Sequence, residues 1–157
     1  MLATTQTLRM SSAAETAKFA ADLAPLLRAG DTLLLEGPIG AGKTHFARAL
    51  VLARLAEPED VPSPTFTLVQ TYSGTDVEIW HCDLYRLTHP DDVLELGLDE
   101  AFESAICLIE WPDRLGALKP QNALSLRFAL TDVPQERLLT LSAQSQRWAP
   151  VLERFSG

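Results

Sequence analysis

At 157 residues the chain has the length of one ordinary domain, and its 46% hydrophobic and 22% charged residues are typical of a globular protein with a buried core. It has no run near the ~18 apolar residues of a membrane span and no cationic, apolar leader, so we expect a cytoplasmic protein with no membrane partner. The net charge of −8 argues against direct contact with nucleic acid, whose phosphates attract a basic surface, so any role near RNA would require a partner protein.

The first third of the sequence predicts a helix, a strand, a glycine-rich loop and a second helix. No internal repeat, low-complexity tract or linker is present, so residues 1–157 are expected to form a single domain. Ser12 and Glu15 make a capping-box pattern at the start of an amphipathic helix. Residues 31–36 read as a short buried strand, and the apolar residues of 43–56 recur at helical spacing.

The rest of the chain predicts a hairpin, short helices and further strands. Two strand-like runs at 66–72 and 77–84 flank a turn. Beyond them we expect short helices at 89–96 and 99–104, a buried strand at 105–109, an antiparallel pair at 123–130 and 137–143, and a terminal helix kinked by Pro150. Cys82 and Cys107 lie in apolar runs without metal-ligand spacing, which predicts buried free thiols. Together these elements predict an α/β fold whose mixed parallel/antiparallel sheet is flanked by helices.

One segment carries a complete phosphate-binding motif. The pattern G-x-x-x-x-G-K-[ST] is matched by Gly37, Pro38, Ile39, Gly40, Ala41, Gly42, Lys43 and Thr44. The glycines let successive N–H groups point inward as an anion nest, to which the following helix adds the positive end of its dipole. The lysine ammonium suits the β- and γ-phosphates, and the threonine hydroxyl is a ligand that Mg²⁺ accepts. The motif therefore predicts a P-loop that binds ATP or ADP with Mg²⁺.

A P-loop needs carboxylates to complete the metal site and to orient the attacking group. Asp83 ends one apolar strand, and Glu110 directly follows another, where an acid of the Walker-B type would stand. The alternative for each is an ordinary surface carboxylate at a strand edge.

Several other residues near these motifs are candidates for the same site. Thr65 lies in a proline-rich loop and is either a sensor of the γ-phosphate or a turn-capping threonine. Trp111 is either an aromatic lid over the site or a packing residue. Arg86, Arg114 and Arg137 are each possible phosphate or adenine contacts, and the sequence does not choose among them.

The P-loop and four later segments, taken in order, resemble the bacterial TsaE (YjeE) family. Those segments are 63–69 (SPTFTLV), 81–87 (HCDLYRL), 95–98 (ELGL) and 109–112 (IEWP). The resemblance implies a weak Mg-dependent ATPase that acts with the TsaB and TsaD proteins in forming threonylcarbamoyladenosine in tRNA (t6A37), with tRNA contacted only through those partners.

The resemblance also implies roles for individual residues. It implies catalytic roles for Asp83, Lys43 and Glu110, Mg²⁺ ligation by Thr44 and Glu110, and nucleotide contacts by residues 37–44, His45, Thr65, Trp111 and Arg137. Of these, His45 stands where a hydroxyl residue is frequent in the family, and its side chain is expected to face away from the phosphates.

Two other functions share the P-loop. A nucleotide-dependent adaptor with negligible turnover would use the same residues. A small-molecule kinase would in addition need a cluster of arginines to clamp the transferred phosphoryl group, and no stretch of the sequence has one.

Overall fold

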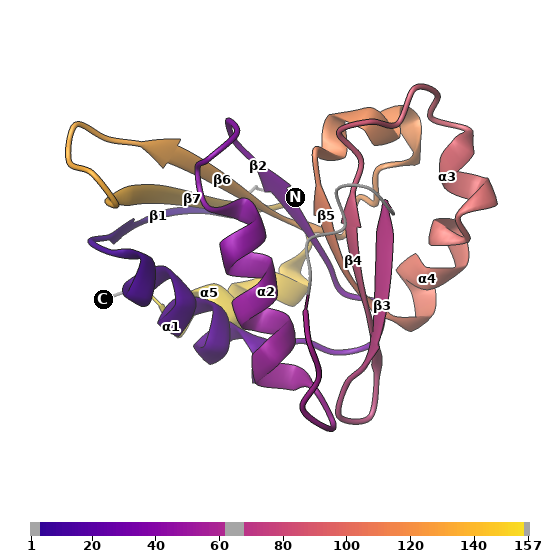
Figure 1. Ribbon diagram of the computed structural model, residues 1–157, viewed down its shortest axis with the longest axis horizontal. Helices are drawn as coiled ribbons and strands as arrows, with labels where there is room; N and C mark the ends of the chain where they lie inside the picture. Colours follow the sequence, from indigo (N-terminus) through magenta and orange to yellow (C-terminus); the bar gives the residue numbers. More distant parts are fainter. Residues whose placement is uncertain (1–3, 62–67, 156–157) are drawn as a thin grey trace.

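The computed structural model describes residues 4–61 and 68–155, and in this part of the chain seven strands form one sheet (Figure 1). The strands are β1 (Thr4–Met10), β2 (Thr32–Glu36), β3 (Val69–Ser73), β4 (Glu78–Asp83), β5 (Ile106–Glu110), β6 (Leu124–Leu130) and β7 (Arg137–Ala143). Their order is β1-β7-β6-β2-β5-β4-β3. The central pairs β6–β2, β2–β5 and β5–β4 are parallel, whereas the outer pairs are antiparallel. The predicted mixed α/β sheet is therefore confirmed.

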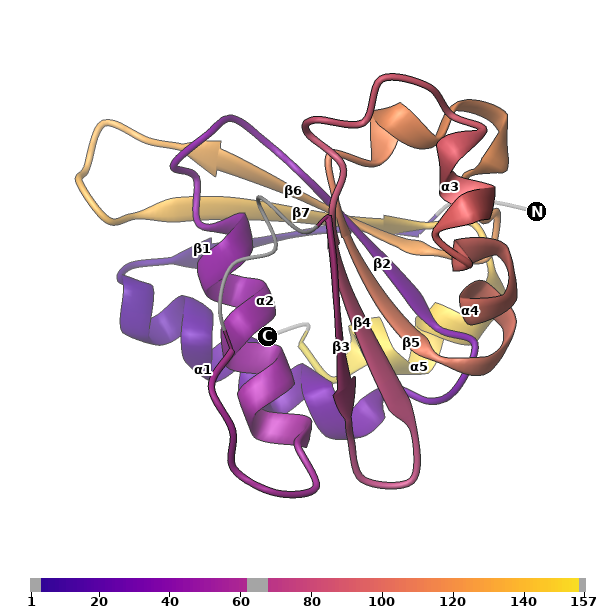
Figure 2. The same ribbon diagram turned by 45° about the vertical axis from the view of Figure 1, so that its right-hand side comes forward.

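Helices pack on both faces of this sheet. The α-helices are α1 (Ala13–Leu23), α2 (Lys43–Arg54), α3 (Asp92–Glu95), α4 (Leu98–Ser104) and α5 (Ala149–Glu153). Short 3₁₀ helices are η1 (Ala24–Leu26), η2 (Pro112–Leu118) and η3 (Gln146–Trp148). Figures 1 and 2 show α1, α2 and α5 on one face, and α3 and α4 on the other, next to β4 and β5. None of the helices in the described part of the chain is long and apolar enough to cross a membrane.

The helix signals in the first third of the sequence are realised. The hydroxyl of Ser12 accepts a hydrogen bond from the N–H of Glu15 at 3.1 Å, and the Glu15 carboxylate accepts one from the N–H of Ser11 at 2.7 Å. The first bond satisfies an N–H that the helix start leaves free, and the second ties Glu15 to the residue just before the N-cap, Ser12. The α1 face then packs on α2 through Phe19 and Phe46, whose ring centroids are 5.8 Å apart.

The central parallel strands place the candidate site at one edge of the sheet. All five residues of β5 are buried, as expected for a parallel strand covered on both faces. Asp83, the last residue of β4, is in register with Glu110, the last residue of β5, and Glu110 is also in register with Leu35 of β2. The carboxyl ends of β2, β4 and β5 therefore meet, and this is the edge at which open α/β sheets bind ligands.

Two features of the fold differ from the sequence-based expectations. No element was predicted for 4–10, which form edge strand β1 along β7. Pro150 was expected to kink the terminal helix, but it lies in the first turn of α5, directly after the first residue, Ala149. Proline is tolerated there because the N–H that it lacks has no intrahelical acceptor.

Both cysteines are free and buried, as predicted. Burial raises the pKa of the Cys82 thiol well above its ordinary value and that of Cys107 to about 12. Both side chains therefore act as small apolar core groups near neutral pH.

Candidate functional site

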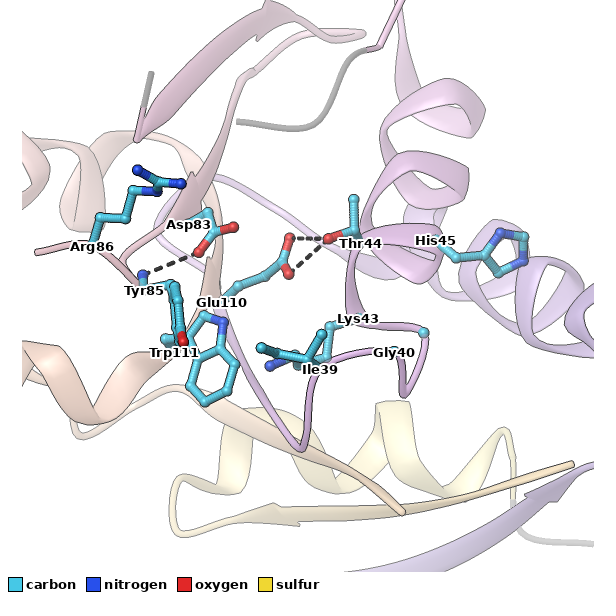
Figure 3. Close-up of a pocket in the computed structure, with 11 residues that line it drawn as sticks. Ile39, Gly40, Lys43, Thr44, His45, Asp83, Tyr85, Arg86, Glu110 and Trp111 are labelled. Carbon is cyan, nitrogen blue, oxygen red and sulfur yellow. Dashed lines mark hydrogen bonds between the residues drawn. The ribbon is translucent and has the colours of Figure 1, made fainter. Parts of the chain in front are cut away.

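A cavity of about 450 Å³ opens at the carboxyl edge of the central strands (Figure 3). This volume lies in the ~300–1,000 Å³ range of small-molecule sites. It is lined by Ile39, Gly40, Gly42, Lys43, Thr44, His45, Asp83, Tyr85, Arg86, Glu110 and Trp111. The P-loop segment, the end of β4 and the end of β5 thus contribute to one pocket, although they are far apart in the sequence.

The backbone of the loop between β2 and α2 depends on glycine at both ends. A Cβ on Gly37 would lie 2.5 Å from the carbonyl oxygen of Phe128 on β6, a distance at which the strand would have to move. Gly42 has φ +100° and is the N-cap of α2, a left-handed conformation that other residues adopt only with strain. Helix α2 therefore starts inside the pocket, with its first N–H groups free of intrahelical partners.

Lys43, the first residue of α2, lines the pocket, and its ammonium is held by two contacts. Its Nζ donates to the carbonyl of Gly37 at 2.6 Å and lies 3.4 Å from the centroid of the Trp111 ring. Burial lowers the pKa of Lys43, and the nearby carboxylates of Glu110, Asp83 and Asp113 oppose that change. The ammonium is thus a cation that has been partly removed from water, which strengthens its attraction for an incoming anion.

Thr44 and Glu110 are joined directly. The Thr44 hydroxyl donates to the Glu110 carboxylate, 2.8 Å from Oε1 and 3.0 Å from Oε2 (Figure 3). On its other side Glu110 Oε2 lies 2.7 Å from Nε2 of His81, a side chain with no exposed surface. The hydroxyl and the carboxylate that were predicted to share a metal ion therefore lie within hydrogen-bonding distance of each other.

Asp83 lies on the same side of the pocket as Glu110 and is also buried. Its Oδ1 accepts a hydrogen bond from the N–H of Tyr85 at 3.0 Å. This bond holds the carboxylate at the strand end, where Asp83 lines the pocket.

Trp111 lies beside Tyr85 and faces the P-loop residues across the pocket. Its backbone is left-handed, with φ 60° and ψ 55°, a conformation that costs a non-glycine residue roughly 1–2 kcal/mol. The turn carries the indole over Lys43 and against the ring of Tyr85, with centroids 5.0 Å apart. Strain of this kind concentrates at functional sites.

The side chains of two residues predicted to contact the nucleotide, His45 and Arg137, do not point into the pocket. His45 lines the pocket, but its ring lies 2.9 Å from the carbonyl of Ala13 and points away, as expected. Arg137 does not line the pocket. Its guanidinium donates to the carbonyls of Ala41 at 3.1 Å and Gly40 at 3.3 Å, so it holds the P-loop from outside.

Of the other residues near the site, some lie in the cavity wall and some do not. Pro38 and Ala41 belong to the loop but not to the cavity wall; the N–H of Ala41 donates to the carbonyl of Pro38 at 3.2 Å, forming a turn. Thr65 lies outside the described residues. Tyr85 was not predicted for the site, although an aromatic residue two positions past a strand-end acid was a usable signal. Arg86 was one of three arginines left open, and it is the one that reaches the wall.

The residues present fit a nucleotide and a Mg²⁺ ion. A Cβ added at Gly40 or Gly42 would meet nothing within 4 Å, so the loop leaves room for phosphate against its backbone. The oxygen donors of Thr44 and Glu110 match the preference of Mg²⁺. No cluster of three or more His, Cys, Asp or Glu side chains able to hold a metal occurs within 4–61 and 68–155.

Comparison with known proteins decides the family. The family model described as "Threonylcarbamoyl adenosine biosynthesis protein TsaE" matches residues 10–138. The chain belongs to the TsaE family. The TsaE protein of Rickettsia bellii is 39% identical over 123 residues, which are 78% of this chain and 85% of that protein. The TsaE protein of Bacillus subtilis is 35% identical over 147 residues, covering 90% and 88% of the two chains.

The fold agrees with this assignment to TsaE. The crystal structure of Bacillus subtilis YdiB matches with a TM-score of 0.79 and 29% sequence identity, covering 98% of this chain and 95% of that one. The α/β P-loop NTPase fold predicted from the sequence is therefore confirmed across nearly the whole chain.

Proposed function

We propose that this chain is the ATP-binding and ATP-hydrolysing component of the cytoplasmic machinery that forms threonylcarbamoyladenosine in tRNA. The observation that carries the proposal is the convergence of Lys43, Thr44, Asp83 and Glu110 on one cavity beside the P-loop. Family membership supports the pathway, because the matched family is described as acting in threonylcarbamoyl adenosine biosynthesis.

Each side chain of the site has a separate role in phosphoryl transfer to water. The P-loop N–H groups and the Lys43 ammonium bind the phosphate chain and stabilise charge that develops on it during transfer. Thr44 and Glu110 would hold Mg²⁺, which when bound neutralises phosphate charge and polarises the oxygens at the γ-phosphorus. Asp83, fixed by Tyr85, orients the attacking water or accepts its proton.

The proposed partners are TsaB and TsaD. With a net charge of −8 the chain offers no general attraction for tRNA, so contacts with tRNA are assigned to the partners. Hydrolysis by the isolated chain is expected to be slow and to be coupled to the partner complex, resetting or activating it between turnovers.

The kinase alternative receives no support from the cavity wall. Arg86 is the one arginine among its lining residues in the described part of the chain, whereas phosphoryl transfer to a small acceptor generally uses several cations in a closing lid.

The test is ATP hydrolysis by the purified chain, measured alone, with TsaB and TsaD together, and with each partner separately. We expect slow phosphate release that rises with both partners and requires Mg²⁺. ATP binding without turnover under every condition would favour the adaptor function. Absence of ATP binding would rule out both.

The fluorescence of Trp111 should report nucleotide binding. The Lys43 ammonium lies 3.4 Å from the indole centroid, and phosphates should draw it off the ring. We expect ATP or ADP to change the intrinsic emission, and Trp111→Phe to lose that change while weakening ATP binding by less than about tenfold. Trp80→Phe is the matched control, since Trp80 does not line the cavity and its indole N–H donates to Glu78, and it should keep the signal. An unchanged signal in Trp111→Phe would contradict the assignment.

Arg137 should contribute to nucleotide affinity without touching the nucleotide. Its bonds to the carbonyls of Gly40 and Ala41 orient two peptide planes of the P-loop. The N–H of the first peptide, that of Ala41, closes a turn onto Pro38, whereas the N–H of the second, that of Gly42, points away from Arg137 because a planar peptide holds its oxygen and its N–H on opposite sides. We expect Arg137→Gln to raise the ATP dissociation constant by about tenfold, since loss of charged hydrogen bonds at a partly exposed site costs on the order of 1 kcal/mol. Isothermal titration calorimetry would measure it. Arg9→Gln, an exposed arginine of β1, is the control, and equal affinities of the two variants would refute the role.

A further inference from the structure

His81 is a buried imidazole that the cavity wall does not include. It lies in the middle of β4, between Gln70 of β3 and Leu108 of β5, and has no exposed surface. We propose that His81 is a positioning residue that fixes the Glu110 carboxylate in the orientation needed to hold Mg²⁺. The inference rests on the proposed function of the site.

His81 and Glu110 are in direct contact. Nε2 of His81 and Oε2 of Glu110 are 2.7 Å apart, and the side chains are 0% and 3% exposed. A carboxylate oxygen only accepts hydrogen bonds, so the imidazole donates through Nε2–H. Nδ1 of His81 is buried and has no hydrogen-bond partner among the described residues, so this one bond is what the ring contributes.

The register of β4 and β5 brings these two side chains together. Glu110 is directly opposite Asp83, and His81 precedes Asp83 by two residues on the same face of β4. His81 and Glu110 are therefore diagonal neighbours across two parallel strands, close enough for long side chains to meet. The backbone of both strands is held by the sheet, so the donor position is fixed independently of the loops that form the rest of the pocket.

A second residue also holds the Glu110 carboxylate. Within the described part of the chain, its carboxylate also accepts a hydrogen bond from the Thr44 hydroxyl, at 2.8 and 3.0 Å. Thr44 is assigned to Mg²⁺ in the proposed function, so its hydroxyl would turn its lone pairs to the ion as that site fills. His81 has no such second task, and it remains as the bond that keeps the carboxylate from rotating.

Mg²⁺ makes the orientation of Glu110 important. The ion requires near-ideal octahedral geometry at short distances, so a carboxylate free to turn is a poorer ligand. Hydrogen-bond partners of metal ligands typically account for 10–100-fold in metal affinity. The Nε2–H of His81 is placed to make this contribution.

The experiment compares His81→Met, which removes the donor, with His81→Gln, whose amide nitrogen can reach the place of Nε2. His89→Met is the matched control, since His89 is exposed and lies outside the pocket. Binding of Mn²⁺ as a spectroscopic substitute for Mg²⁺ is measured by electron paramagnetic resonance in the presence of ADP. ADP binding in EDTA and the melting temperature are measured on the same samples.

We expect His81→Met to weaken Mn²⁺ binding by about 10–100-fold, with ADP binding in EDTA and melting close to wild type. His81→Gln should recover most of the Mn²⁺ affinity, and His89→Met should equal wild type. Wild-type Mn²⁺ affinity in His81→Met would overturn the proposal, as would equal loss in both His81 variants accompanied by lower melting and weaker ADP binding, which would indicate a structural role.

The outcomes separate this inference from the proposed function. The wild-type chain could bind Mn²⁺ and ADP, lose Mn²⁺ affinity on substitution of His81, and yet hydrolyse no ATP with any partner. That result would refute the ATPase and support the positioning role. A chain that hydrolyses ATP and binds Mn²⁺ equally well with His81→Met would refute the positioning role alone. A wild-type chain that binds no Mn²⁺ with ADP would refute both.

Discussion

Replacing Lys43 by methionine is expected to lower kcat/KM for ATP by ~10²–10³-fold, the usual cost of removing one preorganised group that stabilises transition-state charge. Methionine keeps an unbranched apolar side chain at this position and removes the ammonium, which in the wild type donates to the Gly37 carbonyl and lies over the Trp111 ring. The loss should therefore come from the charge rather than from packing. Phosphate release at a series of ATP concentrations measures it.

The control for this variant is Lys18→Met. Lys18 is exposed on α1 and pairs with Asp22 at 3.0 Å, away from the cavity. It removes the same charge from the molecule, so a general electrostatic effect would appear in both variants. If Lys43→Met hydrolysed ATP as well as Lys18→Met, the P-loop would not be the hydrolytic site.

Asp83→Asn should separate binding from chemistry. Its amide oxygen can still accept the hydrogen bond from the N–H of Tyr85, so the strand end should keep its shape. The asparagine side chain cannot act as a base, and its neutral amide oxygen attracts a proton of the attacking water much less than a carboxylate does. Loss of a general base of this kind lowers kcat by ~10²–10⁴-fold. The dissociation constant for ATP should stay within about threefold of wild type, because Asp83 is not assigned to phosphate binding.

Single-turnover hydrolysis and calorimetric ATP binding give the two quantities for Asp83→Asn. Asp91→Asn, an exposed aspartate at the start of α3, is the comparison and should leave both unchanged. The modification assay with TsaB, TsaD and tRNA then asks whether turnover matters to the pathway. Full modification by Asp83→Asn would mean that nucleotide binding alone is sufficient and would favour the adaptor function.

The P-loop could be predicted from the sequence because its determinants are contiguous. Glycine at 37 and 42 is required by backbone conformation and close approach within one short segment, and the strand before it and the helix after it have their own periodicity. The carboxylates could be predicted as strand-end residues for the same reason: each ends an apolar run that is recognisable by itself.

The assignment of partners within the site required the tertiary structure. Glu110, rather than Asp83, contacts Thr44 because β5 lies next to β2 and β4 lies one strand further out. Arg137 reaches the carbonyl of Ala41 across 96 positions of the sequence, through the pairing of β7 with β6 beside the P-loop. Nothing local to Arg137 distinguishes it from a solvated arginine.

Local sequence patterns were enough to predict the α/β class, the phosphate loop and the family, and to single out the two acids at strand ends. Only the tertiary structure shows that β1 forms an edge strand, that the tilted rings of Tyr85 and Trp111 are in contact, and that His81 bonds to Glu110. The division has a physical cause. Turn sterics, helix caps and hydrophobic periodicity act over a few residues, whereas strand order and register are set by burial of the whole sheet, which no short segment encodes.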